Sequence, residues 1–134
     1  MNKKIIVVLI VIRSIPLADG LDALLKAILQ IEEVQIIRNF ENAIRQIENR
    51  KPRIVLIDSA LLGNEPEASL EKVALLSPET QRVLLVDDVQ EVNLVPRYAE
   101  AILFNGISPS AVAAIVTSLL STKGEENEHN DSNQ

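Results

Sequence analysis

The sequence lacks cysteine, and its single histidine, His129, lies in a polar stretch near the end of the chain. Disulfide frameworks and thiolate metal sites are therefore excluded, and one histidine in such a stretch does not anchor a buried metal ion. Zinc sites, thiol redox chemistry and Cys or His nucleophiles are excluded for the same reason. Only three residues are aromatic, which leaves no aromatic platform for a flavin.

Positive charge is also scarce in this chain. Its 13 lysines and arginines are outnumbered by 19 acidic residues, and the formal net charge is −6. Affinity for a phosphate backbone requires a concentration of Lys and Arg that is missing here. We therefore expect no direct nucleic-acid partner.

Long hydrophobic runs are absent, and the apolar run near the N-terminus is Ile5–Ile12. A membrane span needs about 20 such residues. Two lysines precede the run, as in a secretory signal, but Arg13 closes it and no small-residue cleavage site follows. We interpret the run as a buried strand, with a signal peptide as the alternative, and expect a cytoplasmic protein that does not bind membranes.

Phosphate-binding and nucleophile motifs are missing as well. The segment after the first apolar run, RSIPLADG, has one late glycine, Gly20, and neither a GxGxxG nor a GKS pattern. Nucleotide binding is therefore disfavoured, and no GxSxG elbow is present. With no nucleophile–base pair either, the sequence predicts neither an enzyme nor a bound cofactor or metal.

Short apolar runs rich in Val and Ile are what the chain does contain. Their length is typical of strands that are covered on both faces of a parallel sheet. Five strands are predicted: Ile5–Ile12, Val34–Arg38, Arg53–Asp58, Arg82–Val86 and Ala101–Asn105. Helical patterns separate them, and this alternation predicts an α/β fold, a three-layer, doubly wound, five-stranded parallel sheet.

The helical patterns differ in strength. Helices are predicted at Leu17–Leu29, at Phe40–Ile47 after the cap Asn39, at Ala68–Leu76, and from Pro109 onward after the cap Ser108. Glu91–Ala99 contains Pro96, which removes a helical hydrogen-bond donor, so we expect this segment to be short, irregular or bent.

The end of the chain has a different composition. From residue 121 the sequence STKGEENEHNDSNQ contains no apolar residue and is dominated by acids and amides. Such a composition favours disorder. We therefore predict a domain at 1–121 and a disordered acidic tail or linker at 122–134, which is compatible both with a natural terminus and with a connection to a further domain.

Candidate functional residues follow from the predicted topology, because ligands of open parallel sheets bind beyond the carboxyl ends of the strands. The residues at these ends are Ile12, Arg13, Ser14, Asp58, Asp87, Asp88 and Asn105. Polar side chains therefore gather at one edge of the predicted sheet.

At these residues the chain resembles the receiver domain of two-component response regulators, over residues 3 to about 121. The resemblance rests on the five-fold alternation, the aspartate that ends the third strand in VLIDSALLG, and the segment AILFNGISPSAVAAIV. It implies a flavodoxin-like sheet of strand order 2-1-3-4-5 and a role in phosphorelay signal transduction. In this family the third-strand aspartate accepts a phosphoryl group, and an acidic pair after the first strand holds Mg²⁺. A Thr or Ser after the fourth strand and a lysine after the fifth contact the phosphoryl oxygens, and an aromatic residue of the fifth strand reports the switch.

Asp58 matches the phosphoacceptor position of the family, but the other positions depart from the pattern. Ile12 and Arg13, or Arg13 and Ser14, replace the acidic pair, Asp87 replaces the Thr or Ser, Asn105 the lysine, and Ile102 the aromatic residue. Phosphoryl transfer depends on a metal ion and cations that neutralise charge on the phosphoryl oxygens. Arginine does not hold a divalent metal, and Asp87 would repel a phosphoryl group. The resemblance is therefore to a divergent pseudo-receiver.

Arg13 is the candidate that explains an aspartate at the end of so apolar a strand. An ionised Asp58 near Asp87 would be costly without a cation, and the guanidinium of Arg13 is suited to fork onto such carboxylates in place of Mg²⁺. The alternative is that Asp58 only caps the next turn and Arg13 is a solvated surface residue.

The remaining candidates also have two interpretations each. Asp87 and Asp88 form either a relocated metal pair or turn and cap acids, and Asn105 with Gly106 forms either a ligand contact or a turn. Tyr98 and Phe104 mark either a protein-binding surface or part of the core.

These observations favour a pseudo-receiver that acts in signal transduction by protein–protein contact. By resemblance, residues 90–120 are the expected surface for a protein partner or a homodimer. One alternative is a working phosphorelay receiver, phosphorylated at Asp58 with an unusual metal site that includes Asp87 or Asp88. The other is a flavodoxin-like module that binds a small ligand, or a small enzyme.

Overall fold

The structure is a computed structural model that describes residues 5–87 and 99–132, and the side chains of these residues up to 121. The strands in this part of the chain are β1 (Val7–Val11), β2 (Glu33–Ile36), β3 (Ile54–Asp58), β4 (Gln81–Val86) and β5 (Ala101–Phe104). The helices are α1 (Ile15–Lys26), α2 (Phe40–Arg50), the 3₁₀ turn η1 (Ser59–Leu62), α3 (Pro66–Leu76) and α4 (Pro109–Ser132).

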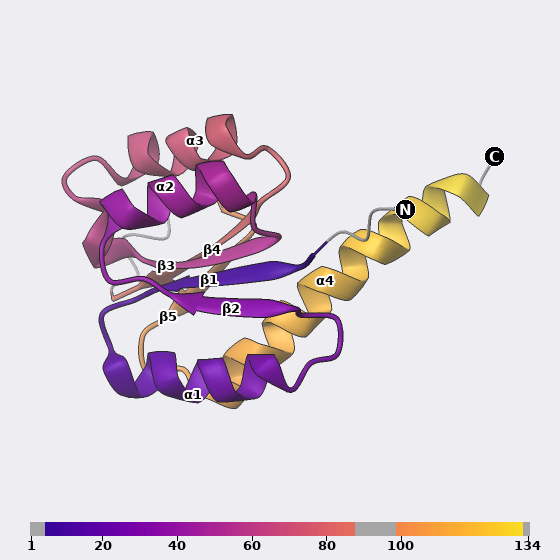
Figure 1. The fold of residues 1–134 in the computed structure, drawn as a ribbon, viewed down its shortest axis with the longest axis horizontal. Coiled ribbons are helices and arrows are strands. Elements are labelled where there is room, and N and C mark those ends of the chain that lie inside the picture. Colours follow the sequence, from indigo (N-terminus) through magenta and orange to yellow (C-terminus); the bar gives the residue numbers. More distant parts are fainter. Residues whose placement is uncertain (1–4, 88–98, 133–134) are drawn as a thin grey trace.

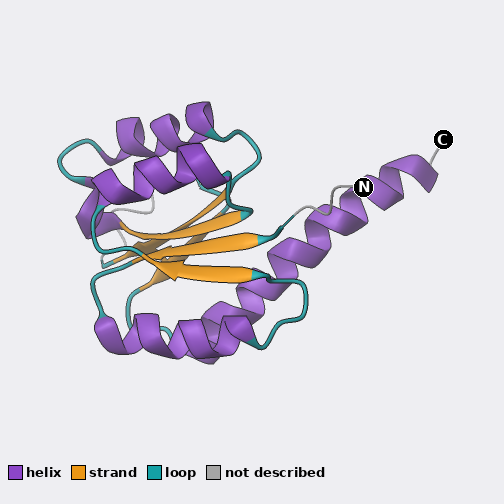
Figure 2. Cartoon of the chain, viewed as in Figure 1, coloured by secondary structure: helices purple, strands orange, loops and turns teal. Residues whose placement is uncertain are grey.

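The strands form one parallel sheet in the order β2-β1-β3-β4-β5. Helices cover both of its faces, so that the sheet lies between two helical layers (Figure 2). The predicted α/β architecture, with five parallel strands in the order 2-1-3-4-5, is confirmed. β1 and β3 occupy the centre of the sheet, and β2 and β5 are its two edges.

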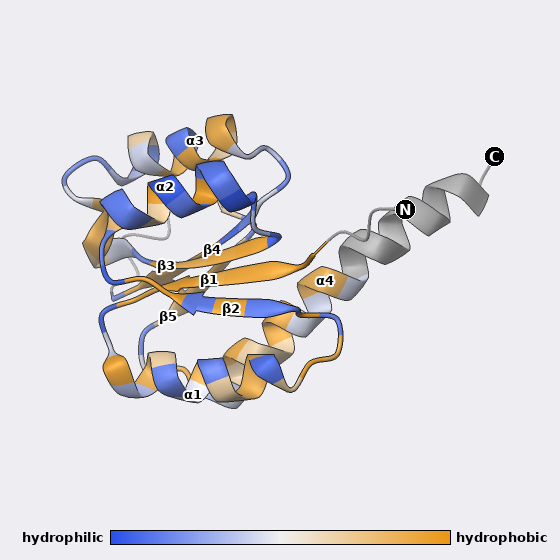
Figure 3. Cartoon of the chain, in the orientation of Figure 1, coloured by the Kyte–Doolittle hydropathy of each residue, from blue (hydrophilic) through white to orange (hydrophobic). Residues whose placement is uncertain are grey.

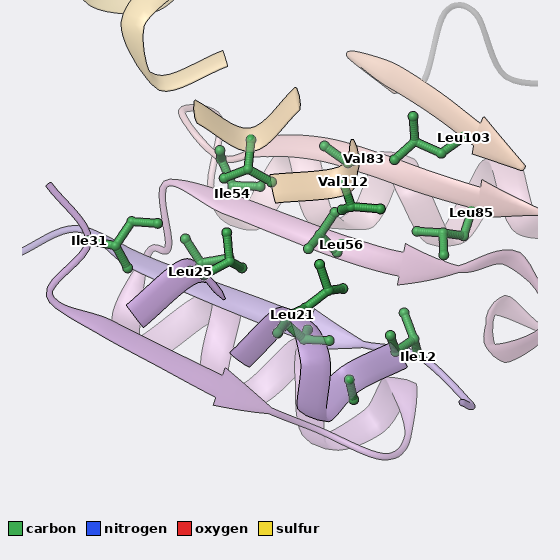
Figure 4. Close-up of a cluster of buried hydrophobic side chains, with 14 of the residues drawn as sticks. Ile12, Leu21, Leu25, Ile31, Ile54, Leu56, Val83, Leu85, Leu103 and Val112 are labelled. Atoms are coloured by element: carbon green, nitrogen blue, oxygen red, sulfur yellow. The ribbon is translucent and has the colours of Figure 1, made fainter. Parts of the chain in front are cut away.

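Each face of the sheet carries its own hydrophobic core, because successive side chains of a strand point to opposite faces. α1 and α4 lie on one face, and α2 and α3 on the other (Figure 1). Leu56 of β3 points into the first core, together with Leu21 and Leu25 of α1 (Figure 4). Val55 and Ile57, its neighbours in β3, point into the second. β1 is buried throughout its length, as its unbroken apolar sequence predicts, and β3 is buried from Ile54 to the aspartate that ends it.

Side-chain caps determine where two of the helices begin. Ser14 accepts a hydrogen bond from the backbone N–H of Leu17 at 3.2 Å, so α1 starts two residues before the apolar repeat. Asn39 caps α2 in the same way, as predicted, with a distance of 2.8 Å to the N–H of Asn42. α1 ends at Lys26 and not at Leu29, because the chain then tightens into i→i−3 hydrogen bonds.

Two predicted features fall at the limits of the described chain. Most of Glu91–Ala99, including Pro96, lies outside the described residues. α4 runs from Pro109 to Ser132 and extends beyond the sheet (Figure 1), so the backbone of 122–132 is helical where composition favours disorder. A domain boundary at 121 stays a prediction. Among the helices of the described residues, none is long and apolar enough to cross a membrane.

Candidate functional site

Four of the predicted site residues lie side by side at the carboxyl edge of the sheet. Arg13 follows β1, Asp58 is the last residue of β3, Asp87 follows β4 and Asn105 follows β5. These strands are consecutive neighbours in the sheet, with Asp58 of β3 in register with Leu85 of β4. The parallel topology therefore brings together residues that are far apart in the sequence, and we call them the edge cluster.

Asp58 is the buried member of the edge cluster, with 2% of its surface exposed. Its Oδ2 accepts two hydrogen bonds from Arg13, one from Nε at 2.7 Å and one from the backbone N–H at 3.2 Å. Its Oδ1 accepts a hydrogen bond from the backbone N–H of Ala60 at 3.2 Å, which makes Asp58 the N-cap of η1. Asp58 therefore caps the next turn and also pairs with Arg13, so both of the contacts considered for it are present.

The guanidinium of Arg13 bridges two carboxylates. While Nε binds Asp58, Nη2 donates to both oxygens of Asp87, at 3.0 and 3.1 Å. The hydrogen bond to Asp58 is the largest effect on Arg13 and raises its pKa. Burial opposes it, and the charge of Asp58 and the contact with Asp87 raise the pKa further. Arg13 therefore carries its positive charge at neutral pH.

The two carboxylate contacts of Arg13 differ in their exposure to water. The side chain of Asp58 is 3% exposed, whereas those of Arg13 and Asp87 are 48% and 49% exposed. Water screens the Arg13–Asp87 contact, as it does other surface ion pairs, so this contact adds little stability. The Arg13–Asp58 contact is shielded on one side and satisfies a carboxylate that would otherwise be buried without a countercharge.

Asn105 extends the edge cluster to β5. Its Nδ2 donates to Oδ1 of Asp87 at 2.5 Å, while its backbone N–H donates to the carbonyl of Val86 at 2.9 Å. Gly106 follows with φ +100°, a conformation that favours glycine, so the turn predicted for Asn-Gly is present together with the side-chain contact. A continuous row of hydrogen bonds thus runs from Arg13 through Asp87 to Asn105.

The other candidates lie elsewhere. Ile102, at the family's aromatic position, packs against the core between the sheet and α2 and α3. Phe104 is 46% exposed on the edge strand β5. Asp88 and Tyr98 lie outside the described residues. One donor to Asp58, the backbone N–H of Arg13, was not predictable, because every residue carries such a group and no sequence signal marks it.

The edge cluster does not fit the Mg²⁺ ion that the resemblance to receiver domains implies. A magnesium site needs several oxygen ligands around one point, but here a guanidinium lies between the carboxylates of Asp58 and Asp87. In the described part of the chain, no group of three or more His, Cys, Asp or Glu side chains is placed to hold a metal ion. The arrangement keeps two carboxylates bound to one fixed cation.

Comparison with known proteins identifies the fold that carries this site. No family model matches the sequence, and no curated protein matches it. Solved structures do match: a CheY-like response regulator receiver domain from Methanospirillum hungatei is similar with a TM-score of 0.76 and 21% identity, over 91% of this chain and 98% of that one. The chain has the receiver fold.

Further structures agree with this assignment. A CheY-like receiver domain from Methylobacillus flagellatus has a TM-score of 0.70 and 18% identity, over 85% of this chain and 98% of that one. A streptococcal protein described as a redox sensor evolved from two-component response regulators has a TM-score of 0.82 and 16% identity. This match covers 92% of the present chain and 55% of the streptococcal one. The sequence resemblance to receiver domains is thus confirmed in three dimensions.

Proposed function

We propose that this chain is a pseudo-receiver: a signalling module with the receiver fold that acts by protein–protein contact, is not an enzyme, and has impaired or no phosphoacceptor chemistry at Asp58. The observation that carries the proposal is the bridge of Arg13 between Asp58 and Asp87. The similarity to receiver domains over most of the chain supports the signalling role.

The contacts of Asp58 argue against transfer of a phosphoryl group to it. Its Oδ2 already accepts two hydrogen bonds from Arg13, and its Oδ1 accepts one from Ala60. A phosphoryl group on Asp58 would displace Arg13 and lie near the negative charge of Asp87. Because phosphoryl transfer relies on metal ions and positioned cations to neutralise the transferred oxygens, a site with two acids and one immobilised guanidinium is poorly suited to it.

The test is incubation with a small phosphodonor and Mg²⁺, followed by mass spectrometry of the intact protein. We expect no mass increase, under conditions in which an active receiver domain gains one phosphate. The Asp58→Asn variant is the matched control, because it keeps the size of the side chain and removes the acceptor carboxylate. A gain of one phosphate in the wild type that is absent from Asp58→Asn would overturn the proposal and establish the phosphorelay alternative.

The partner surface belongs to the same proposal. We assign it to residues 90–120, of which 99–120 are described and include β5 and the first part of α4. Phe104 offers an exposed aromatic ring there, on an edge strand, and aromatic residues are enriched at protein interfaces. Either a different protein or a second copy of the chain fits this surface, and a cytoplasmic location accords with such a role.

A further inference from the structure

Among the described residues, no strand pairs with the outer side of β2, the edge of the sheet opposite β5. Within β2, the N–H of Glu33 donates to the carbonyl of Ile6, and the N–H of Ile37, just after it, donates to the carbonyl of Ile10. Because backbone groups of a parallel strand alternate in direction, those of Val34 and Ile36 face away from β1. β2 thus has one side open for a further strand.

A groove accompanies this open side. It has a volume of about 410 Å³ and lies between β2, the residues that follow it and α2. The residues that line it are Gln35, Ile36, Ile37, Arg38, Asn42 and Gln46. α1 packs closely against β2, whereas α2 packs mainly against β1 and α3 and reaches β2 through the ion pair of Arg50 with Glu33. The groove is therefore the part of the β2 edge that the α2 layer leaves uncovered.

The lining combines polar and apolar side chains and carries a single charged one. Three of the six lining residues are carboxamides, which bind peptide groups as donors and acceptors. Arg38 is the charged residue and is exposed. The nearest acid in β2, Glu33, is already bound by Arg50 of α2. Among the described residues the lining thus presents a cation without an acid beside it in the groove, although the protein as a whole is acidic.

The hydropathy of the residues along the sheet agrees with a binding edge. β1 is apolar throughout, whereas β2 has hydrophilic stretches (Figure 3). Gln35 adds a second indication, because its Oε1 is buried and has no hydrogen-bond partner among the described residues. Such an acceptor is unfavourable, and a rotation of the amide toward a donor in the groove would satisfy it.

We propose that the β2 edge binds an extended, acidic peptide segment of a partner protein, which adds to the sheet as a sixth strand beside β2. The backbone of this segment pairs with Val34 and Ile36. Its side chains on the α2 face enter the groove, where a carboxylate meets Arg38. This surface lies at the opposite edge of the sheet from residues 99–120 and is independent of the pseudo-receiver proposal.

The experiment is selection of binding peptides from a display library of random peptides of about eight residues, a common strand length. We expect enriched sequences rich in β-branched residues and with at least one Asp or Glu. The best of these, made as a free peptide and added to isotope-labelled protein, should shift NMR signals of 33–46 and leave the edge cluster unchanged. N-methylation of alternate peptide bonds should weaken binding at least about tenfold, because it removes the strand pairing.

Matched variants test the charge. Arg38→Glu should weaken binding of the acidic peptide at least about tenfold, whereas Lys72→Glu, an exposed cation of α3 away from the groove, should not change it. The proposal is overturned if selection yields no peptide, if the peptides shift signals elsewhere, or if the two charge variants behave alike. A dimer in solution that Arg38→Glu dissociates would assign the edge to a second copy of the chain and would equally overturn it.

Discussion

At the scale of single residues, Arg13 balances the charge of the edge cluster. Its Nε and backbone N–H bind the buried Asp58, and its Nη2 binds the exposed Asp87. The buried contact matters more, because a carboxylate that water cannot reach depends on its protein donors. The metal ion that the resemblance to receiver domains implies and this arginine are both cations, but only the arginine is covalently part of the chain.

Replacing Arg13 by alanine should destabilise the fold by about 1–3 kcal/mol, because Asp58 is then buried with fewer donors. The measurement is urea denaturation at neutral pH. Arg45→Ala is the matched control, since Arg45 contacts only the exposed Asn42 among the hydrogen bonds described. Equal losses for the two variants would show that the Arg13–Asp58 contact contributes nothing. In a double-mutant cycle, Asp58→Asn should remove most of the effect of Arg13→Ala.

A second ion pair gives the protein a pH dependence. Arg50 binds Glu33, and this hydrogen bond, with a smaller contribution from the charge of Arg50, lowers the pKa of Glu33 below its ordinary value of 4.5. The pKa of Glu33 is lower in the folded state than in the unfolded state. The ion pair therefore stabilises the protein at pH values above the ordinary pKa, and this contribution disappears as the pH falls through the folded-state pKa.

The corresponding test compares the wild type with Glu33→Gln by urea denaturation over a range of pH. The wild type should be the more stable of the two near neutral pH, and the difference should shrink as the pH falls below 4.5 and through the lowered pKa of Glu33. The pair is partly exposed, so the difference is expected to be modest and to shrink with added salt. A difference that is constant over the whole range would contradict this account.

At the scale of elements, the packing of α1 on α4 depends on a small residue. A Cβ atom at Gly20 of α1 would lie 3.1 Å from Cγ of Pro109, at the start of α4. This approach places α4 close to α1, and Val112, one turn further along α4, reaches the same core as Leu21 and Leu25 of α1 (Figure 4). The glycine therefore sets the distance between two helices.

Gly20→Val should destabilise the protein by about 1–3 kcal/mol, because the added methyl groups overpack the contact with Pro109. Thermal or urea denaturation measures the loss. Ala23→Val is the matched control: it places the same β-branched side chain on an exposed position of the same helix, where only the small propensity cost applies. If both variants lose the same stability, the close approach of the helices is not limiting.

The elements themselves were largely predictable, and their limits were less so. The unbroken apolar runs of β1 and β3 indicate burial on both faces, and the sheet buries them in that way. The caps Asn39 and Ser108 were recognisable because an N-cap has a limited choice of residue types. The start of α1 was missed by two residues, since Ser14 lies outside the apolar repeat and acts through a single hydrogen bond.

At the scale of the whole molecule, topology explains the edge cluster. Aspartate, arginine and asparagine become neighbours because β1, β3, β4 and β5 are parallel and adjacent. This strand order was predictable from the alternation of strands and helices together with the resemblance to receiver domains. The groove beside β2 was not predictable. It depends on how far α2 leaves the edge of the sheet uncovered, which the packing of α2 against β1 and α3 decides.

The central claim is that a fixed arginine stands where the fold family holds a divalent ion. Its most direct test is an NMR titration with Mg²⁺ that follows the Nε–H signal of Arg13 and the amide signals of Asp58 and Ala60. The Arg13→Asp variant places a carboxylate beside Asp58 and should show saturable shifts of the amide signals. It is the positive control for the sensitivity of the measurement. The wild type should show none at millimolar Mg²⁺, whereas saturable shifts with loss of the Arg13 hydrogen bond would contradict the account.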